Sequence, residues 1–262
     1  MEPFQLNKHT YNVDNDLNKV IGITSRHGGI SEYPNGSLNM SLYIDDCDDF
    51  VHHNQKVVAQ EIDFSTEQWV FPIQKHGNNI QQVYSEDKGT NVEILTDKWH
   101  DIDGLYSYDK GILLTMCFAD CVPVYLYSVT NDFIALGHAG WRGTVGLILE
   151  RLIKAYDGDI NDLRCLIGPS ISAPCYEVNE DIKEKFLALN LDLEDCFYLN
   201  PNDMYDINLQ EINKRIALNS GIPEQNIKVT KHCTAKENTE FFSYRLEKGK
   251  TGRMLAYIGT RD

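Results

Sequence analysis

The sequence predicts a single domain of mixed α/β or α+β class, with strands and helices intermixed along the chain. Apolar runs of strand length recur in the middle of the sequence, and the apolar period then changes to that of a helix. At least one pair of runs has the spacing of a hairpin. No repeat, low-complexity linker or composition shift marks a boundary, so residues 1–262 are treated as one domain.

Four predicted strands come first, and they occupy residues 68–73, 111–118, 122–128 and 132–138. The last two flank a short polar connection at residues 129–131, which indicates a hairpin. A strictly alternating parallel sheet is therefore not expected, and the sheet is predicted to be mixed.

A helix is predicted next, over residues 143–156, because its apolar side chains recur on one helical face. A buried strand follows at residues 163–167, closed by Gly168-Pro169. The remaining predictions are two amphipathic helices and two late strands, at residues 180–189, 206–219, 241–244 and 254–258.

The chain is acidic, with 24 Lys and Arg against 39 Asp and Glu and a net charge of −15. Such a surface repels nucleic acid and anionic lipid, although a local pocket can still bind a small anion. No apolar run has the ~18 residues of a membrane span. The N-terminus lacks the features of a signal peptide, and the seven cysteines are scattered, so we expect a cytoplasmic protein with reduced thiols.

Three candidate ligands follow predicted strands, at the points where the apolar pattern ends. They are His76, Cys121 and His138. Two imidazoles and one thiolate suit Zn²⁺ with water in the open fourth position, and the metal lowers the pKa of that water towards ~7. The alternative is a buried thiol with core histidines, and a cysteine–histidine pair can also act as nucleophile and base.

Several motifs identify the chain as similar to one family. They are QKHG (74–77), ADCVPV (119–124), HAGWRG (138–143), GPSISAPCYEV (168–178), CT (233–234), FFSYR (241–245), TGRM (251–254) and SLNMSL (37–42). Through these motifs the sequence resembles the laccase-domain, or multicopper polyphenol oxidase-like, family, whose members are also described as purine nucleoside phosphorylases and peptidoglycan editing factors.

The resemblance implies a single α/β sandwich of mixed β-sheets packed together, with helices on the outside. It implies phosphorolysis of adenosine, inosine and methylthioadenosine, together with adenosine deamination. The partners are then a small nucleoside and phosphate. The family's metal ligands correspond to His76, Cys121 and His138. The oligomeric state is left open.

A true multicopper oxidase is disfavoured by the residues themselves. Such an enzyme needs many imidazoles, usually in HxH pairs, and this chain has eight histidines and no HxH. A single bound Cu²⁺ remains compatible with two histidines and one cysteine. A cysteine hydrolase acting on cell-wall peptide precursors is a further alternative, with Cys121 activated by a histidine. A non-enzymatic binding role ranks behind both.

Two carboxylates are candidates for proton transfer during deamination. Asp120 precedes Cys121, and for this residue pinning a turn by accepting backbone N–H bonds is favoured over catalysis. Asp103 precedes Gly104 and also has an ordinary turn interpretation.

Arg142 is the first candidate for phosphate, because a guanidinium binds phosphate oxygens in a bidentate manner. Its alternative is stacking on Trp141 or pairing with a carboxylate. Arg26 and Arg245 are secondary phosphate candidates, and Asn39 is a candidate for the ribose or base.

Two aromatic side chains of the motifs, Tyr176 and Phe242, are predicted to belong to the core rather than to stack on a purine.

Overall fold

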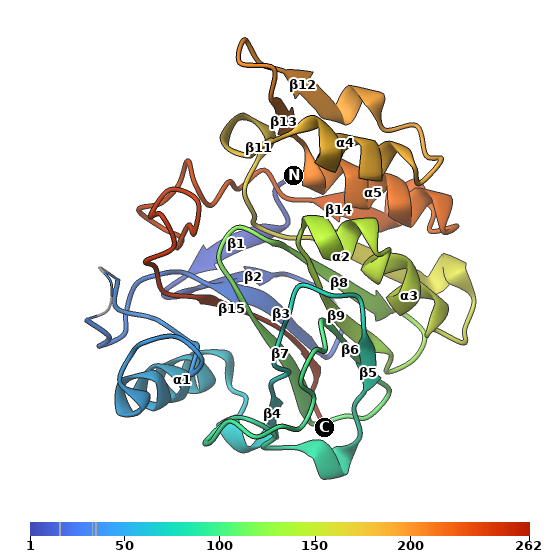
Figure 1. The fold of residues 1–262 in the computed structure, drawn as a ribbon. Helices are drawn as coiled ribbons and strands as arrows, with labels where there is room; N and C mark the ends of the chain where they lie inside the picture. The colour runs from blue at the N-terminus through green and yellow to red at the C-terminus, as the bar shows by residue number, and fades with distance from the viewer. Residues whose placement is uncertain (16, 33, 35) are drawn as a thin grey trace.

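Two six-stranded mixed sheets pack face to face in a computed structural model, which describes residues 1–15, 17–32, 34 and 36–262 (Figure 1). The first sheet has the order β1 (Phe4–Asn7), β2 (Thr10–Val13), β3 (Lys19–Thr24), β15 (Met254–Thr260), β7 (Ile112–Phe118), β4 (Trp69–Val70). The second has the order β14 (Ile227–Val229), β10 (Leu163–Ile167), β8 (Val122–Ser128), β9 (Ile134–Ala139), β6 (Gly104–Ser107), β5 (Ile80–Gln82).

Both sheets mix parallel and antiparallel pairs, as the sequence predicts. In the first sheet β4 runs parallel to β7, and in the second β5–β6 and β10–β14 are parallel. The predicted hairpin is confirmed, because β8 and β9 are adjacent antiparallel strands joined by a short connection.

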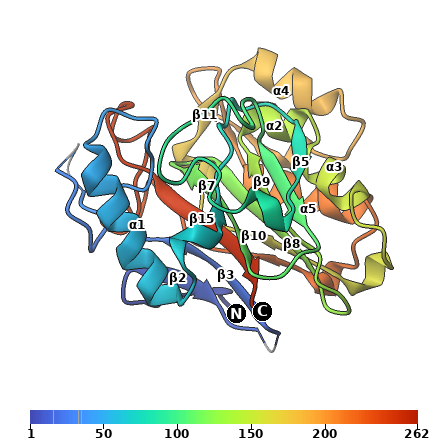
Figure 2. The same ribbon diagram turned by 90° about the horizontal axis from the view of Figure 1, so that it is seen from below.

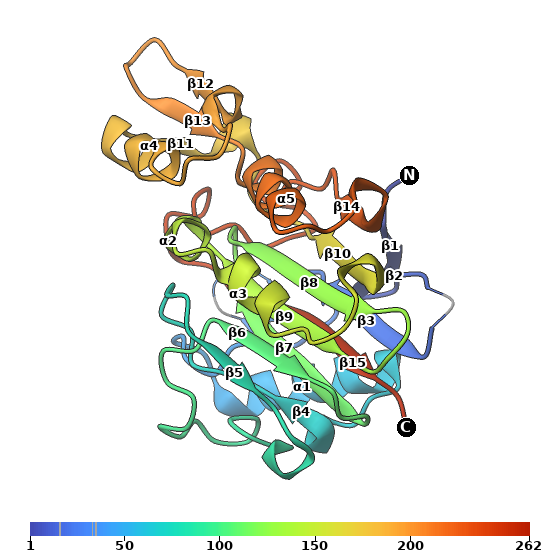
Figure 3. The same cartoon turned by 90° about the vertical axis from the view of Figure 1, so that its right-hand side faces the viewer.

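A small third sheet projects from one end of the sandwich, next to α4 (Figure 3). Its order is β11 (Glu177–Val178), β13 (Tyr205–Ile207), β12 (Phe197–Leu199). The α-helices are α1 (Asp48–Ile62), α2 (Trp141–Val145), α3 (Ile148–Lys154), α4 (Glu180–Leu187) and α5 (Leu209–Asn219).

The helices lie outside the two large sheets, which confirms the expected sandwich. Figure 2 shows α1 on one side of the sheets and α3 with α5 on the other. One apolar cluster fills the space between the sheets, a second lies between the first sheet and the α1 side, and a third packs the helices against the second sheet.

The strand β15 shows why the central strands are apolar throughout. Met254, Ala256 and Ile258 point into the cluster between the sheets, whereas Leu255 and Tyr257 belong to the cluster on the α1 side. Successive side chains point to opposite faces of a strand. Because both faces are covered, nearly every position along the strand is apolar.

The single helix predicted over residues 143–156 is wrong, because the structure divides it into α2 and α3. Leu147 has a left-handed φ of 57°, and the carbonyl of Gly146 accepts a hydrogen bond of 2.7 Å from the Asn78 side chain. At the break, the Asn78 side chain satisfies the Gly146 carbonyl, and the left-handed conformation of Leu147 interrupts the helix.

The strand predicted at residues 241–244 is also wrong. These residues form an irregular segment that leads into a turn at residue 244, although Phe241 and Phe242 are fully buried between the sheets. Their apolar character reflects burial of the side chains in the core, which does not require a ladder of backbone hydrogen bonds.

Element ends differ elsewhere by a few residues. The strand predicted at 68–73 is shorter in the structure and corresponds to β4. The first residues of the predicted helix 206–219 belong to β13. Asn208 then caps α5 by accepting the Glu211 N–H at 3.0 Å. The strands predicted at 163–167 and 254–258 are confirmed. Within the described residues, no helix combines the length and the apolar character that crossing a bilayer requires.

We predict that Leu136→Ala lowers the free energy of unfolding by about 2–5 kcal/mol, because Leu136 is 0% exposed between the sheets and its truncation leaves a cavity. The matched control Leu199→Ala, at a side chain that is 64% exposed, should change it by less than about 0.5 kcal/mol. Urea denaturation measures both variants. Equal effects would contradict the packing described here.

Candidate metal and active site

The hairpin of β8 and β9 brings two of the predicted ligands together. His138 lies in β9 opposite Pro123, and Cys121 stands immediately before β8. Gly140 follows β9 across from Cys121, and a Cβ atom there would lie 2.9 Å from the Cys121 sulfur. A glycine is therefore required for the two chain segments to approach this closely.

His76 reaches the same point from the loop that follows β4. Its φ is 62°, in the left-handed region that a non-glycine residue adopts at a cost in free energy. The ring centroids of His76 and His138 are 4.8 Å apart in an edge-to-face arrangement. The ligand atoms of His76, Cys121 and His138 all lie within 4.8 Å of one another.

The buried carboxylate of Asp103 holds this loop against β9. Its two oxygens accept the backbone N–H groups of Lys75, His76 and Gly77 at 3.1, 3.0 and 2.8 Å, and one oxygen also contacts His138 Nδ1 at 2.8 Å. Each oxygen therefore accepts two hydrogen bonds. These contacts differ from the proton-transfer role suggested for Asp103 by the sequence, because they occupy the carboxylate fully.

Asp103 also sets the tautomer of His138. Burial alone would raise the pKa of the carboxyl, but hydrogen bonds and charge from His138, with the backbone N–H groups, lower it below its usual value. An ionised carboxylate only accepts hydrogen bonds, so Nδ1 of His138 donates and Nε2 is left to face an ion.

The thiol and the imidazole favour each other's charged forms. Burial on its own would raise the pKa of Cys121, but the charge of His138 and hydrogen bonds with His138 and His76 lower it to about 6. Burial would lower the pKa of His138, yet Cys121 and Asp103 raise it to about 9. A thiolate is the form that binds metal, and it is also the form that acts as a nucleophile.

The donor set fits a single metal ion. Two imidazole nitrogens at about 2.0–2.1 Å and one thiolate at about 2.3 Å from a tetrahedral ion lie about 3.5 Å from one another, a short movement from the separations observed. Among the residues that the structure describes, these three form the one group of at least three His, Cys, Asp or Glu close enough to share an ion. Zn²⁺ and Cu²⁺ both suit these ligands.

Asp120 lies beside Cys121, but its carboxylate points into other contacts. Its φ is 85°, Oδ1 accepts the Thr234 hydroxyl at 2.6 Å, and Oδ2 accepts the Arg245 N–H at 2.7 Å. Its backbone carbonyl also accepts the Ile171 N–H at 2.9 Å. This geometry matches the turn-pinning alternative, and nothing in it tests the predicted catalytic role.

Two of the predicted phosphate residues lie near the ligand group on exposed surface. Arg142, in the first turn of α2, stacks on Trp141 at 4.3 Å, and Arg245 stacks on Tyr176 at 4.8 Å. The pKa of Tyr176 rises to about 12, through burial first and then the charge of Cys121, with both arginines opposing the rise. Tyr176 therefore lies close enough to the Cys121 sulfur and to both guanidinium groups for their charges to act on its hydroxyl. It is half-buried and packs against the apolar cluster on the helix side of the second sheet, so its predicted place in the core is met in part.

Asn39 and Arg26 are committed to the fold instead. The Asn39 amide is fully buried, donates to Asp46 at 2.8 Å, and accepts the N–H groups of Ser41 and Arg253. It is therefore not available to a ribose or a base. The substrate role predicted for Asn39 does not agree with this geometry, because its motif builds a buried turn.

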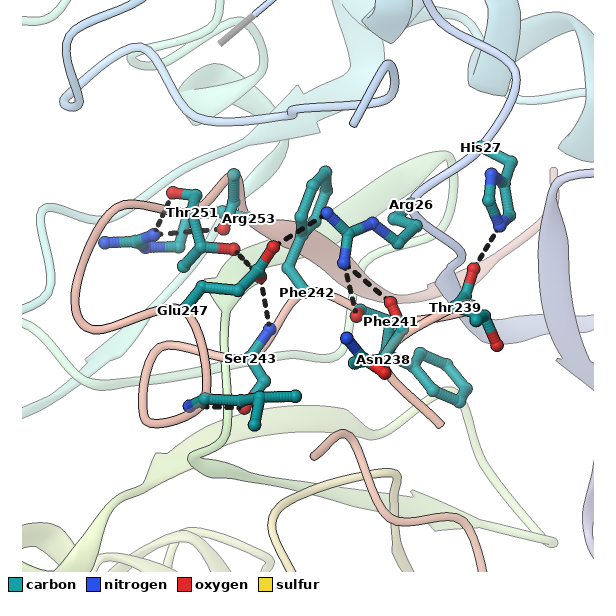
Figure 4. A network of polar contacts seen from close by, with 12 residues as sticks. Arg26, His27, Asn238, Thr239, Phe241, Phe242, Ser243, Glu247, Thr251 and Arg253 are labelled. Carbon is teal, nitrogen blue, oxygen red and sulfur yellow. Dashed lines mark hydrogen bonds and ion pairs between the residues drawn. The ribbon is translucent and has the colours of Figure 1, made fainter. Parts of the chain in front are cut away.

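Arg26 lies in the network shown in Figure 4. Its guanidinium pairs with Glu247 at 2.9 Å, donates to the carbonyls of Asn238 and Phe241 at 2.6 and 3.3 Å, and stacks on Phe242 at 4.7 Å. Buried in this way, it joins the segment after β3 to the turns before β15. The phosphate role predicted for Arg26 likewise disagrees with the structure.

Sequence reasoning missed two features of the site. The orienting contact of Asp103 depends on a loop and a strand that lie far apart in the sequence, so only the fold reveals it. The closeness of Gly140 to Cys121 could have been predicted in part from the sequence. A glycine directly after a strand often marks a close approach of two chain segments, and Gly140 directly follows the strand that contains His138.

Comparison with known proteins places these residues in a family context. Residues 20–261 match the family described as multi-copper polyphenol oxidoreductase laccase. Among curated proteins, the chain is 49% identical to a purine nucleoside phosphorylase of Staphylococcus saprophyticus over 93% of this chain and 92% of that protein. It is 46% identical to a purine nucleoside phosphorylase of Staphylococcus epidermidis, over 96% and 95%.

Solved structures agree with the fold over its whole length. YlmD from Geobacillus stearothermophilus has a TM-score of 0.96 and 34% identity, covering 100% of both chains. The Neisseria meningitidis protein NMB0706 has a TM-score of 0.86 and 26% identity, covering 97% of this chain and 100% of that one.

We predict that Asp103→Asn weakens Zn²⁺ binding by about 10–100-fold, because an amide cannot accept four hydrogen bonds and no longer orients His138. Titration against a chromophoric chelator measures the affinity. Asp101→Asn, at a neighbouring exposed carboxylate, is the control and should bind as the wild type does. Wild-type affinity in Asp103→Asn would refute the orienting role.

A pH dependence of stability is predicted for the pair of Arg26 and Glu247. Burial would raise the pKa of Glu247, but hydrogen bonds from Thr251 and Arg26 lower it below its usual value of 4.5. Below that value the unfolded chain binds more protons than the folded one, so the stabilisation is present above pH ~4.5 and is lost as the pH falls through the folded pKa.

The advantage of the wild type over Glu247→Gln in unfolding free energy should therefore shrink on acidification from pH ~7 to ~3. Denaturant unfolding at several pH values measures it. Glu224→Gln, which removes the exposed carboxylate paired with Lys214, serves as the control with little pH dependence. A constant difference between wild type and Glu247→Gln would contradict this account.

Proposed function

The chain belongs to the multi-copper polyphenol oxidoreductase laccase family, and we propose that within it this protein is a metal-dependent purine nucleoside phosphorylase. The observation that carries the proposal is the convergence of His76, Cys121 and His138 beside two exposed, stacked arginines. The names of the curated relatives support the same assignment.

The proposed substrates are adenosine, inosine and methylthioadenosine, each split with phosphate into a free base and a (methylthio)ribose 1-phosphate. In this reaction a phosphate oxygen bonds to C1′ of the ribose while the bond from C1′ to the base breaks. The base leaves with the electron pair and takes up a proton. Adenosine deamination is proposed as a second activity, in which water replaces the amino group at C6.

Arg142 and Arg245 are the proposed phosphate-binding residues. Both side chains are exposed, and each guanidinium carbon lies over an aromatic ring, at 4.3 Å for Arg142 and 4.8 Å for Arg245, which helps to preorganise the donors. They supply local positive charge on a chain whose net charge is −15. Tyr176 is protonated at neutral pH, as an ordinary tyrosine is, and burial and the Cys121 charge raise its pKa further, so its hydroxyl is able to donate a hydrogen bond to the substrate.

His76, Cys121 and His138 would hold the ion, which we propose to be Zn²⁺, with Cu²⁺ as the alternative. When bound, such an ion supplies a Lewis acid next to the substrate. Asp103 orients His138 and fixes the backbone of the His76 loop. Cys121 and His138 thus serve the reaction as ligands, and Asp120 is proposed to keep the Cys121 turn in place.

A cysteine hydrolase acting on cell-wall peptide precursors is the second candidate. The low pKa of Cys121 beside two histidines favours it, because this is also the arrangement of a thiolate nucleophile with its base. A polyphenol oxidase with several coppers is not favoured, since the described residues contain one group of three ligands rather than several.

The decisive experiment incubates pure, zinc-loaded protein with adenosine, with and without phosphate, and identifies the products. Adenine that appears only with phosphate supports phosphorolysis, and inosine formed without phosphate supports deamination. A metalloenzyme loses activity to a chelator and regains it with Zn²⁺, whereas a thiol hydrolase does not. If the metal-replete protein converts none of the nucleosides, the proposal is refuted.

We predict that Cys121→Ala loses zinc and both nucleoside activities together, because a ligand of the ion is removed. Metal analysis should find about one zinc per wild-type chain and far less in the variant. Cys47→Ala, at an exposed thiol, is the control and should retain both. Wild-type zinc content in Cys121→Ala would show that the ligand set is different.

A further inference from the structure

A second thiol site, which contains none of the metal ligands, lines a cavity of about 430 Å³. The cavity is open to solvent and is lined by residues of the loop 172–174, the small sheet, the start of α5 and the segment 231–237. Cys233 lines it, and so does Ser172. Neither residue is a metal ligand, and neither takes part in the proposed nucleoside reaction.

The sulfur of Cys233 is surrounded by hydrogen-bond donors. It accepts the Ser172 hydroxyl at 2.9 Å and the Ser172 N–H at 3.3 Å. Burial would raise the pKa of Cys233, but these contacts and the N–H groups of Lys236 and Ala235 outweigh it and lower the pKa. The donors stabilise a negative charge on this sulfur, so the thiolate is favoured.

The backbone of Cys233 is also fixed. Its N–H donates to Glu237 at 2.9 Å, and the N–H of Thr234 donates to the Ser170 carbonyl at 3.0 Å. The side chain lines the cavity and is 3% exposed, so a small reagent reaches the sulfur more readily than a large one.

A second cysteine, Cys175, lies three residues after Ser172, whose hydroxyl contacts the Cys233 sulfur. Cys175 ends the short 3₁₀ turn Ala173–Cys175, and its N–H donates to the Ser172 carbonyl at 3.0 Å. Cys175 is half-buried. Burial raises its pKa most, and the charge of Cys233 and a hydrogen bond with Cys233 raise it further. Ser172 therefore connects a thiol that favours the thiolate with one that keeps its proton.

We propose that Cys233 is a peroxide-reactive thiol that forms a disulfide with Cys175. The Cys233 thiolate attacks a hydroperoxide, so that an S–O bond forms, the O–O bond breaks, and the departing oxygen takes up a proton. The Cys175 sulfur then attacks the Cys233 sulfur, the S–O bond breaks, and water leaves with the Cys175 proton. Two thiols are oxidised, and one hydroperoxide is reduced.

The test treats zinc-loaded wild-type protein with an equimolar amount of hydrogen peroxide and maps its peptides without reduction. A cross-linked peptide pair containing Cys175 and Cys233, lighter by ~2 Da than the two thiols, is expected as the main product. In Cys175→Ser the resolving thiol is missing, so dimedone should label the sulfenic acid on Cys233. In Cys233→Ser both the cross-link and this label should disappear.

Cys47→Ser is the matched control, because Cys47 is exposed and lies outside the cavity, and its loss should leave the cross-link unchanged. The proposal fails if the wild type gives no cross-linked pair. It also fails if dimedone labels Cys47 more than Cys233 in Cys175→Ser, or if Cys175 and Cys233 each pair with other cysteines.

Discussion

The buried carboxylate of Asp103 is the interaction on which the candidate site depends. It accepts three consecutive N–H groups from the His76 loop and one from His138, and so joins a loop to a strand of the second sheet. His76 is held at a positive φ by these bonds, which offset the free energy of that backbone conformation. Without this carboxylate, two of the three ligands would lose their common support.

The packed sheets hold His138 and Cys121, the ligands next to the Asp103 carboxylate and the β8–β9 hairpin, in fixed positions. β9 is covered on both faces, so His138 has little freedom, and the hairpin sets Cys121 across from Gly140. The proposed phosphate-binding arginines lie on exposed surface beside this rigid group. A fixed ligand set with solvent-exposed cationic side chains nearby is an arrangement that suits a small anionic co-substrate.

Much of the fold is predictable where the apolar pattern is continuous. The strands β7 to β10 are buried on both faces, and their runs identify them from the sequence. The helix α1 escaped prediction because its inward face includes Asn54 and Gln55, which break the apolar period. Asn54 is buried because its amide donates to Ser31, Ser37 and Asn39, contacts that no local pattern predicts.

The site was partly predictable for a related reason. Three ligands at the ends of apolar runs are visible in the sequence, and the fold brings them together. Asn39 belongs to one of the recognisable motifs and Arg26 lies shortly before it in the chain, yet both are buried and serve the fold. A motif records that a residue is needed, and only burial and partners distinguish a contact with substrate from a contact with the chain.

X-ray absorption at the zinc edge of the zinc-loaded protein tests the central claim most directly. The account predicts one sulfur at about 2.3 Å and two imidazole nitrogens at about 2.0–2.1 Å, with one further light atom. A spectrum without sulfur, or with two sulfurs, would contradict the joining of His76, Cys121 and His138 around one ion.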